Sequence, residues 1–227
     1  MMTPRAYRLA ALAAATLTGS LAVACSSSSN GVGPSGNNDR SDTVMVAAQQ
    51  TGYVESGAGD PAFASPGSDI RVGDDAARDP LIAVRGFIGF DLRSLPSGIH
   101  VQSATLVATQ CAVSGSPFTL GNVVVDHVTY PAPFDTTVFA ESAIAMQVGT
   151  LSTDASIGTR SVSVTSSVVS DIVAGRDSSQ FRLRMSTSND AGNGPSNQVI
   201  FASDSAHTVD CTPAGGQQPR LVIAFLP

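Results

Sequence analysis

Short runs of β-branched and apolar residues, separated by clusters of Gly, Pro, Asn and Asp, restrict the fold of this 227-residue chain more than any other feature. Runs with period-two alternation are typical of strands that bury one face, and their spacing is typical of a sandwich or a barrel. We therefore predict an all-β fold. The expected strands are Thr43–Ala48, Ile70–Val72, Ile82–Asp91, Ser103–Ala112, Asn122–Thr129, Arg160–Thr165, Phe181–Ser186, Gln198–Ser203 and Arg220–Phe225.

The clearest run is Phe181-Arg182-Leu183-Arg184-Met185, in which the apolar side chains share one face and the arginines share the other. This alternation predicts a half-buried antiparallel strand whose polar face meets solvent. The same alternation assigns two further sets of residues to the core: Ile88, Phe90 and Leu92, and Ala104, Leu106 and Ala108.

One short helix is expected after the capping sequence Thr165-Ser166-Ser167, with Gly175 as its end. Its apolar stripe consists of Val168, Val169, Ile172 and Val173. A second short helix is expected at Phe139–Val148.

The N-terminal segment has the pattern of an export signal. Arg5 and Arg8 precede the Ala- and Leu-rich run Leu9–Ala24, which is shorter than the roughly 20 residues of a bilayer-spanning helix. Its end resembles bacterial lipoprotein signals, in which the cysteine that follows the small residues carries the lipid; here that residue is Cys25. Ala22 stands where such signals usually carry Leu, and ordinary secretion with cleavage near Ala22 or Ala24 is the alternative.

The expected organisation is a signal peptide at residues 1–24, a flexible Ser-, Gly- and Asn-rich tether at 25–42 and a β-sandwich domain at 43–227. Two or three acyl chains on Cys25 would hold the chain stably on a membrane. Ser26 is not the acidic residue that lipoproteins of some bacteria use for inner-membrane retention. We therefore expect an exported, lipid-anchored protein at the outer membrane or cell surface.

The other two cysteines, Cys111 and Cys211, lie far apart in the sequence and lack the CxxC or Cys/His spacing of a zinc site. In an oxidising compartment such a pair predicts a disulfide. Closing a loop of about 100 residues would contribute on the order of 4 kcal/mol to the free energy of unfolding. Two separate buried thiols are the alternative.

The charge of the chain argues against nucleic acid as a partner. The formal net charge is -6, and the 12 basic residues are all arginines, two of which lie in the signal. No basic patch is present to neutralise phosphates.

Six segments carry a wider resemblance: Asp69–Gly73, Phe87–Gly98, Val101–Leu106, Val162–Thr165, Phe181–Arg184 and Gln218–Ile223. In this order they resemble the DNRLRE domains, bacterial surface modules related to the disaggregatase-type jelly rolls. The resemblance covers about residues 44–226 and implies a two-sheet antiparallel β-sandwich of jelly-roll type with one or two short helices. For some relatives it also implies polysaccharide binding. Family members often carry tryptophans around the stretch that here reads Phe134–Glu141, whereas this chain has no Trp.

Two groups of residues are candidates for ligand binding. Without Trp, an aromatic platform for a sugar ring has to come from Tyr53, Tyr130 or a Phe outside the core. The long polar loop Thr187–Asn197 is the second candidate, with a simple connector as the alternative. Its hydrogen-bonding residues are Asn189, Asp190, Asn193 and Asn197.

Five aspartates fall in one Gly- and Pro-rich stretch and offer the hard oxygen ligands that calcium needs. They are Asp60, Asp69, Asp74, Asp75 and Asp79. Their spacing matches no EF-hand loop, and a solvated acidic loop is the alternative. No other cofactor is expected.

The motifs of common hydrolases are absent. His100, His127 and His207 show no HExxH spacing, and the sequence has no GxSxG elbow. We therefore expect a non-catalytic envelope module that binds polysaccharide or another envelope component. A structural envelope lipoprotein, or spacer, with a protein partner and no glycan binding is the alternative.

Lipid attachment at Cys25 is testable in cells grown with a labelled fatty acid. The wild-type chain should take up label, and Cys25→Ser should take up none because the acceptor sulfur is gone. Label retained by Cys25→Ser would contradict the assignment.

Overall fold

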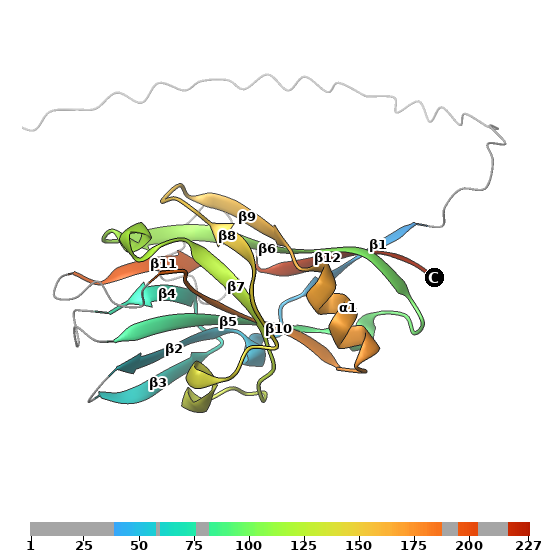
Figure 1. Cartoon of the computed structure of the whole chain (residues 1–227), viewed down its shortest axis with the longest axis horizontal. Coiled ribbons are helices and arrows are strands. Elements are labelled where there is room, and N and C mark those ends of the chain that lie inside the picture. The colour runs from blue at the N-terminus through green and yellow to red at the C-terminus, as the bar shows by residue number, and fades with distance from the viewer. Residues whose placement is uncertain (1–38, 58–59, 76–81, 188–194, 204–217) are drawn as a thin grey trace, which may run out of the picture. The chain divides into compact units, whose positions relative to one another are not determined.

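Twelve antiparallel strands form a curled sheet around an apolar core (Figure 1). The structure is a computed structural model and describes residues 39–57, 60–75, 82–187, 195–203 and 218–227. The all-β prediction is confirmed. The strands are β1 Arg40–Met45, β2 Gly52–Gly57, β3 Asp60–Pro66, β4 Ile70–Asp74, β5 Ala83–Asp91, β6 His100–Ser114, β7 Val123–Val128, β8 Ala145–Ser152, β9 Gly158–Ser163, β10 Ser178–Met185, β11 Asn197–Phe201 and β12 Arg220–Leu226.

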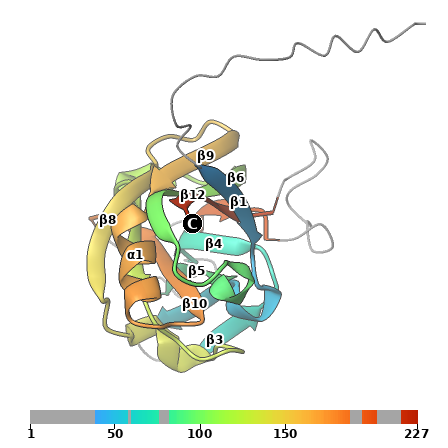
Figure 2. The same cartoon turned by 90° about the vertical axis from the view of Figure 1, so that its right-hand side faces the viewer.

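The sheet has two halves that face each other across the core (Figures 1 and 2). The first half has the order β1-β12-β6-β11-β4, with β9 attached to β6. The second half has the order β5-β10-β7-β8, with the hairpin β2-β3 attached to β5. Because hydrogen bonds link β4 to β5, the described strands belong to one continuous sheet, and the expected division into two separate sheets is not confirmed.

Strand β5 joins the two halves. Its residues from Gly86 to Asp91 pair with β10, whereas Ala83 and Val84 pair with the end of β4. Near its other end, Phe90 forms an isolated bridge with Val46, just after β1. The sheet thus curls at β5, and one strand contacts both outer strands of the first half.

The core lies between the inner faces of the two halves. The predicted inward faces of β5 and β6 are confirmed, and the apolar side chains of the arginine-bearing strand β10 are buried as expected. The largest fully buried side chains are Phe87, Phe90, Phe181, Phe201, Ile70, Ile82, Ile88, Leu106, Leu183, Met185, Leu221 and Ile223.

A smaller core covers the outer face of the second half. The segment between β7 and β8 places Tyr130 and Phe134 on Phe87, with ring centroids 5.4 and 5.6 Å from that of Phe87. Val54 of β2 and Val138 also belong to this cluster. Edge-to-face and tilted aromatic pairs of this kind add stability beyond the area they bury. A second packed layer therefore covers the outer face of this half.

This second layer corrects the expectation that the arginines of β10 meet solvent. Arg182 and Arg184 both donate to the carboxylate of Asp126 on β7, at 2.8 and 2.9 Å, and Asp126 is 0% exposed. Burial alone would raise the pKa of Asp126, but the hydrogen bonds from Arg184, the Gln147 amide and Arg182 lower it on balance. Burial, followed by the charges of Arg182 and Arg184, lowers the pKa of Arg85 to about 10.

The helices agree only in part with the prediction. The helix α1 Thr165–Val173 is present, and Gly175 follows it with a φ of 67°. Val169 and Val173 are 36% and 82% exposed, so half of the predicted apolar stripe does not face the core. The Thr165 hydroxyl accepts from the Ala104 amide instead of capping the helix. Within the described ranges, four 3-10 helices occur: η1 Ala48–Gln50, η2 Leu92–Ser94, η3 Pro117–Leu120 and η4 Thr136–Ala140.

The second helix expected at Phe139–Val148 is absent, and that prediction is wrong: the end of η4, an irregular stretch and the first four residues of β8 occupy the range. Pairing with β7 overrides the helix-favouring composition of the segment, and Gln147 takes a φ of 49° while its amide donates to Asp126. The hairpin β2-β3 was not predicted either. Strand β3 contains two prolines, Pro61 and Pro66, which is compatible with its position at the edge of the sheet. Strand β1 also begins at Arg40, inside the expected tether.

The buried carboxylate predicts a large, pH-dependent loss of stability in Asp126→Asn. Removing one partner of a buried ion pair costs about 3–5 kcal/mol, because the arginines remain buried without their counter-charge. Since the pKa of Asp126 is lowered in the folded state, this contribution is present above the unfolded pKa of about 3.9 and fades as the pH falls below it. Denaturant unfolding at pH 7 and pH 3 measures both effects.

The matched control is Asp154→Asn, which removes the carboxylate partner of Arg160 at the surface, where Asp154 is largely exposed. It should change the free energy of unfolding little, because exposed ion pairs contribute little. Equal losses in the two variants at pH 7 would contradict a special role for Asp126.

Candidate functional site

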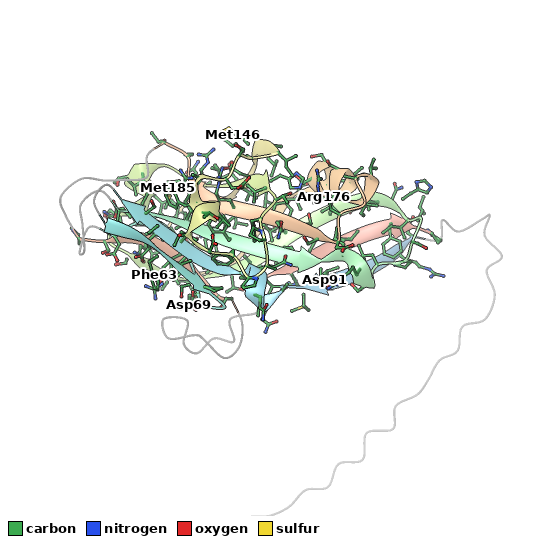
Figure 3. All side chains as sticks on the ribbon, turned by 90° about the horizontal axis from the view of Figure 1, so that it is seen from below. Phe63, Asp69, Asp91, Met146, Arg176 and Met185 are labelled. Atoms are coloured by element: carbon green, nitrogen blue, oxygen red, sulfur yellow. The ribbon has the colours of Figure 1, made fainter. Side chains whose placement is uncertain are left out.

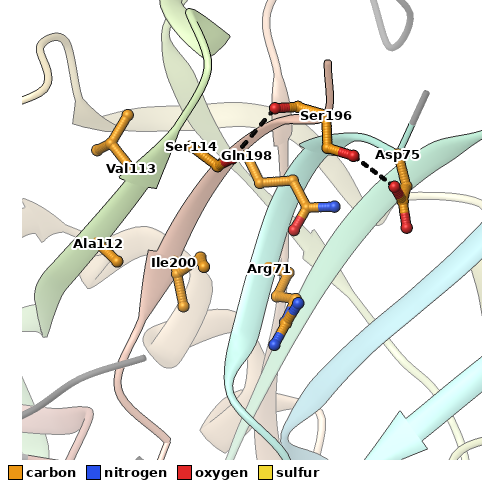
Figure 4. A pocket seen from close by; sticks show the side chains of 8 residues that line it. All are labelled: Arg71, Asp75, Ala112, Val113, Ser114, Ser196, Gln198 and Ile200. Atoms are coloured by element: carbon orange, nitrogen blue, oxygen red, sulfur yellow. Dashed lines mark hydrogen bonds between the residues drawn. The ribbon is translucent and has the colours of Figure 1, made fainter. Parts of the chain in front are cut away.

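An open polar pocket of about 410 Å³ lies on the outer face of β4, β11 and β6 (Figure 4). Successive strand residues alternate between the two faces, so Ile70 and Val72 enter the core while Arg71 points outward. Across the ladder, Ile200 of β11 is paired with both Arg71 and Ala112, and Gln198 is paired with Ser114. The pocket residues are Arg71, Asp75, Ala112, Val113, Ser114, Ser196, Gln198 and Ile200.

Arg71 connects this pocket to the hairpin β2-β3. Its guanidinium carbon lies 5.3 Å from the centroid of the Tyr53 ring, within the range of a cation–π contact. Tyr53 is half-buried, and burial, followed by the charge of Glu55, raises the pKa of its hydroxyl. The structure thus brings the predicted Tyr53 to the border of the pocket.

The pocket offers donors and acceptors side by side. The Ser196 hydroxyl donates to Asp75 at 2.5 Å, and the Ser114 hydroxyl donates to the Ser196 carbonyl at 3.3 Å (Figure 4). Gln198 contributes an amide that both donates and accepts, and Arg71 contributes guanidinium donors. Such an alternation suits a ligand rich in hydroxyl groups.

Asp75 is the one carboxylate among the described residues that line this pocket. Glycoside hydrolysis uses a pair of carboxyl groups on opposite sides of the scissile bond.

The structure assigns structural roles to two of the predicted ligand-binding residues. Tyr130 is buried, and its hydroxyl donates to the Gln50 carbonyl at 2.8 Å. Asn197 is also buried, and its side chain accepts from the Ser116 amide at 2.8 Å and donates to Asp74 at 3.2 Å. Neither side chain is available to a ligand, and the expectation that they bind one is corrected.

The aspartates proposed for calcium have separate surroundings. Asp74 is buried and accepts from the backbone amide of Asn197 at 2.8 Å, which ties β4 to β11. Asp75 faces the pocket, and Asp69 is buried at the start of β4. Among the described residues, no group of three or more Asp, Glu, His or Cys side chains could hold a metal ion. The described part of the acidic stretch thus does not form the expected calcium site.

The histidine beside Asp126 lies in a buried hydrogen-bond network. His127 points to the opposite face of β7, where its Nε2 lies 2.9 Å from Asp171 of α1. Both side chains are 1% exposed. Asp171 also accepts from Arg176 and Ser179, at 2.7 and 2.6 Å. This buried network fixes α1 to the sheet.

Several predicted site residues lie outside the described residues. They are Cys25, Asp79, Asn189, Asp190, Asn193 and Cys211, and the side chain of Asp60 is likewise not described. Cys111 is half-buried on β6, and its pairing with Cys211 stays a prediction.

Arg71 and Gln198 are pocket residues that sequence reasoning missed. The alternation of Ile70, Arg71 and Val72 was a usable signal, because it turns Arg71 away from the core. Its contact with Tyr53 joins strands that the sequence does not pair, and no local pattern indicates it.

No protein-family model and no curated protein sequence matches the chain. The resemblance to DNRLRE domains therefore stays a hypothesis. In the part of the chain that the structure describes, no helix is long and apolar enough to cross a bilayer.

Proposed function

We propose that the chain is a lipid-anchored, non-catalytic module of the cell envelope that binds polysaccharide in the pocket on β4, β11 and β6. The observation that carries the binding proposal is the position of Arg71, which contacts the Tyr53 ring and lines the same pocket as Asp75 and Ser196. Sugar-binding sites combine an apolar surface with a few convergent polar groups.

Geometry supports this proposal over the spacer alternative. A spacer with a protein partner would use a flat, apolar surface. The pocket is instead open, polar and built on three paired strands, and the hydrogen bonds of Ser196 hold its rim. A rigid scaffold of this kind reduces the entropy lost when a ligand binds.

Export and anchoring are proposed from the N-terminal sequence, with Cys25 as the lipidated residue. The tether that follows would let the domain reach envelope polysaccharide from the membrane. The expected location is the outer membrane or the cell surface.

Binding is testable by affinity electrophoresis of the purified full chain in gels that contain xylan, laminarin, galactan, pectin or hyaluronan. At least one polymer should retard the wild-type chain. Arg71→Met should weaken that retardation about tenfold or more, because it removes charged donors but keeps the apolar stem.

Arg93→Met is the matched control, because Arg93 is exposed on η2 and pairs with Asp91 away from the pocket. It should bind like the wild-type chain. If none of these polymers retards the wild-type chain, the polysaccharide proposal fails and the spacer takes its place.

A further inference from the structure

Phe63 is an aromatic side chain that neither core uses. It lies on β3, the strand of the hairpin β2-β3 that is farther from β5, and it is 45% exposed. Figure 3 shows it at the margin of the sheet. Large exposed apolar side chains occur singly on many surfaces, so exposure alone assigns no role to Phe63.

The Phe63 ring contacts a second aromatic ring, that of Tyr53. The Phe63 ring centroid lies 6.2 Å from that of Tyr53, and the rings are tilted by 52°. The Tyr53 ring also makes a cation–π contact with the guanidinium of Arg71, and Arg71 lines the pocket. Phe63, Tyr53 and Arg71 thus form one continuous row from the edge of the hairpin to the pocket.

The two aromatic residues of the row differ in how much of each ring a sugar could contact. Tyr53 is half-buried, contacts both Arg71 and Phe63, and has limited ring area left for a ligand. Phe63 is the exposed ring in the row and can cover the apolar C–H face of a pyranose.

We propose that Phe63 is a second subsite, an aromatic platform for one sugar ring of a chain whose neighbouring ring occupies the pocket at Arg71. This inference rests on the proposed function and narrows its ligand. A single sugar cannot contact the platform and the pocket together, so the ligand class is an oligosaccharide or polysaccharide of at least two units. Affinity should therefore rise with chain length until both subsites are filled, as for two linked binding modules.

The test uses the purified full chain and oligosaccharides of one to six units from xylan, laminarin, galactan, pectin and hyaluronan, with dissociation constants measured by calorimetry. Phe63→Leu keeps an apolar side chain but removes the aromatic face. It should weaken binding of the longer oligosaccharides about three- to tenfold and leave binding of single sugars unchanged. Phe63→Trp should restore or increase the affinity.

Met146→Ala is the matched control, because Met146 is an apolar side chain that is 69% exposed on β8, away from Phe63 (Figure 3). It should bind all lengths like the wild-type chain. If Phe63→Leu binds all lengths like the wild-type chain while Arg71→Met binds none, the platform is refuted and the pocket stands. If the wild-type chain binds no member of the panel, both proposals fail.

Discussion

The pairing of β5 with both halves of the sheet is the constraint on which the rest of the structure depends. Ala83 and Val84 continue the ladder from β4, and the following residues of the same strand pair with β10. The ladder therefore turns at this strand, and the apolar faces of the two halves meet around Ile88 and Phe90. Without this turn, the alternating strands would expose their apolar face to water on one side.

The outer face of one half of the sheet is covered by other residues, whereas the outer face of the other half has an open pocket. On the second half, an aromatic layer and the ion pairs of Asp126 cover the sheet, so polar side chains there stabilise the fold. On the first half, the same alternation turns Arg71 and Gln198 toward an open pocket. Arg182 and Arg184 stabilise the fold through their ion pairs with Asp126, whereas Arg71 lines an open pocket, where an arginine can contribute to recognition.

Period-two patterns were a good predictor of the strands that bury one face. In such strands the alternation of apolar and polar residues directly reflects which face is buried. Strand β3 escaped prediction because its prolines are tolerated only at an edge position, which the neighbouring strands define. The alternation placed Arg182 on the face opposite Leu183 but not against Asp126, since the covering segment comes from a distant part of the chain. The sequence also could not distinguish Tyr53, whose ring contacts Arg71 beside the pocket, from Tyr130, whose hydroxyl donates to the Gln50 carbonyl inside the fold.

The central claim is that the open outer face around Arg71 is where this domain meets its ligand. Hydrogen–deuterium exchange of the full chain, with and without a polysaccharide that retards it in gels, tests this claim most directly. We predict slower exchange in β3, β4 and β11 on addition of the polymer and no change in α1 or β8. Protection confined to α1 and β8, with β4 and β11 unchanged, would contradict the account.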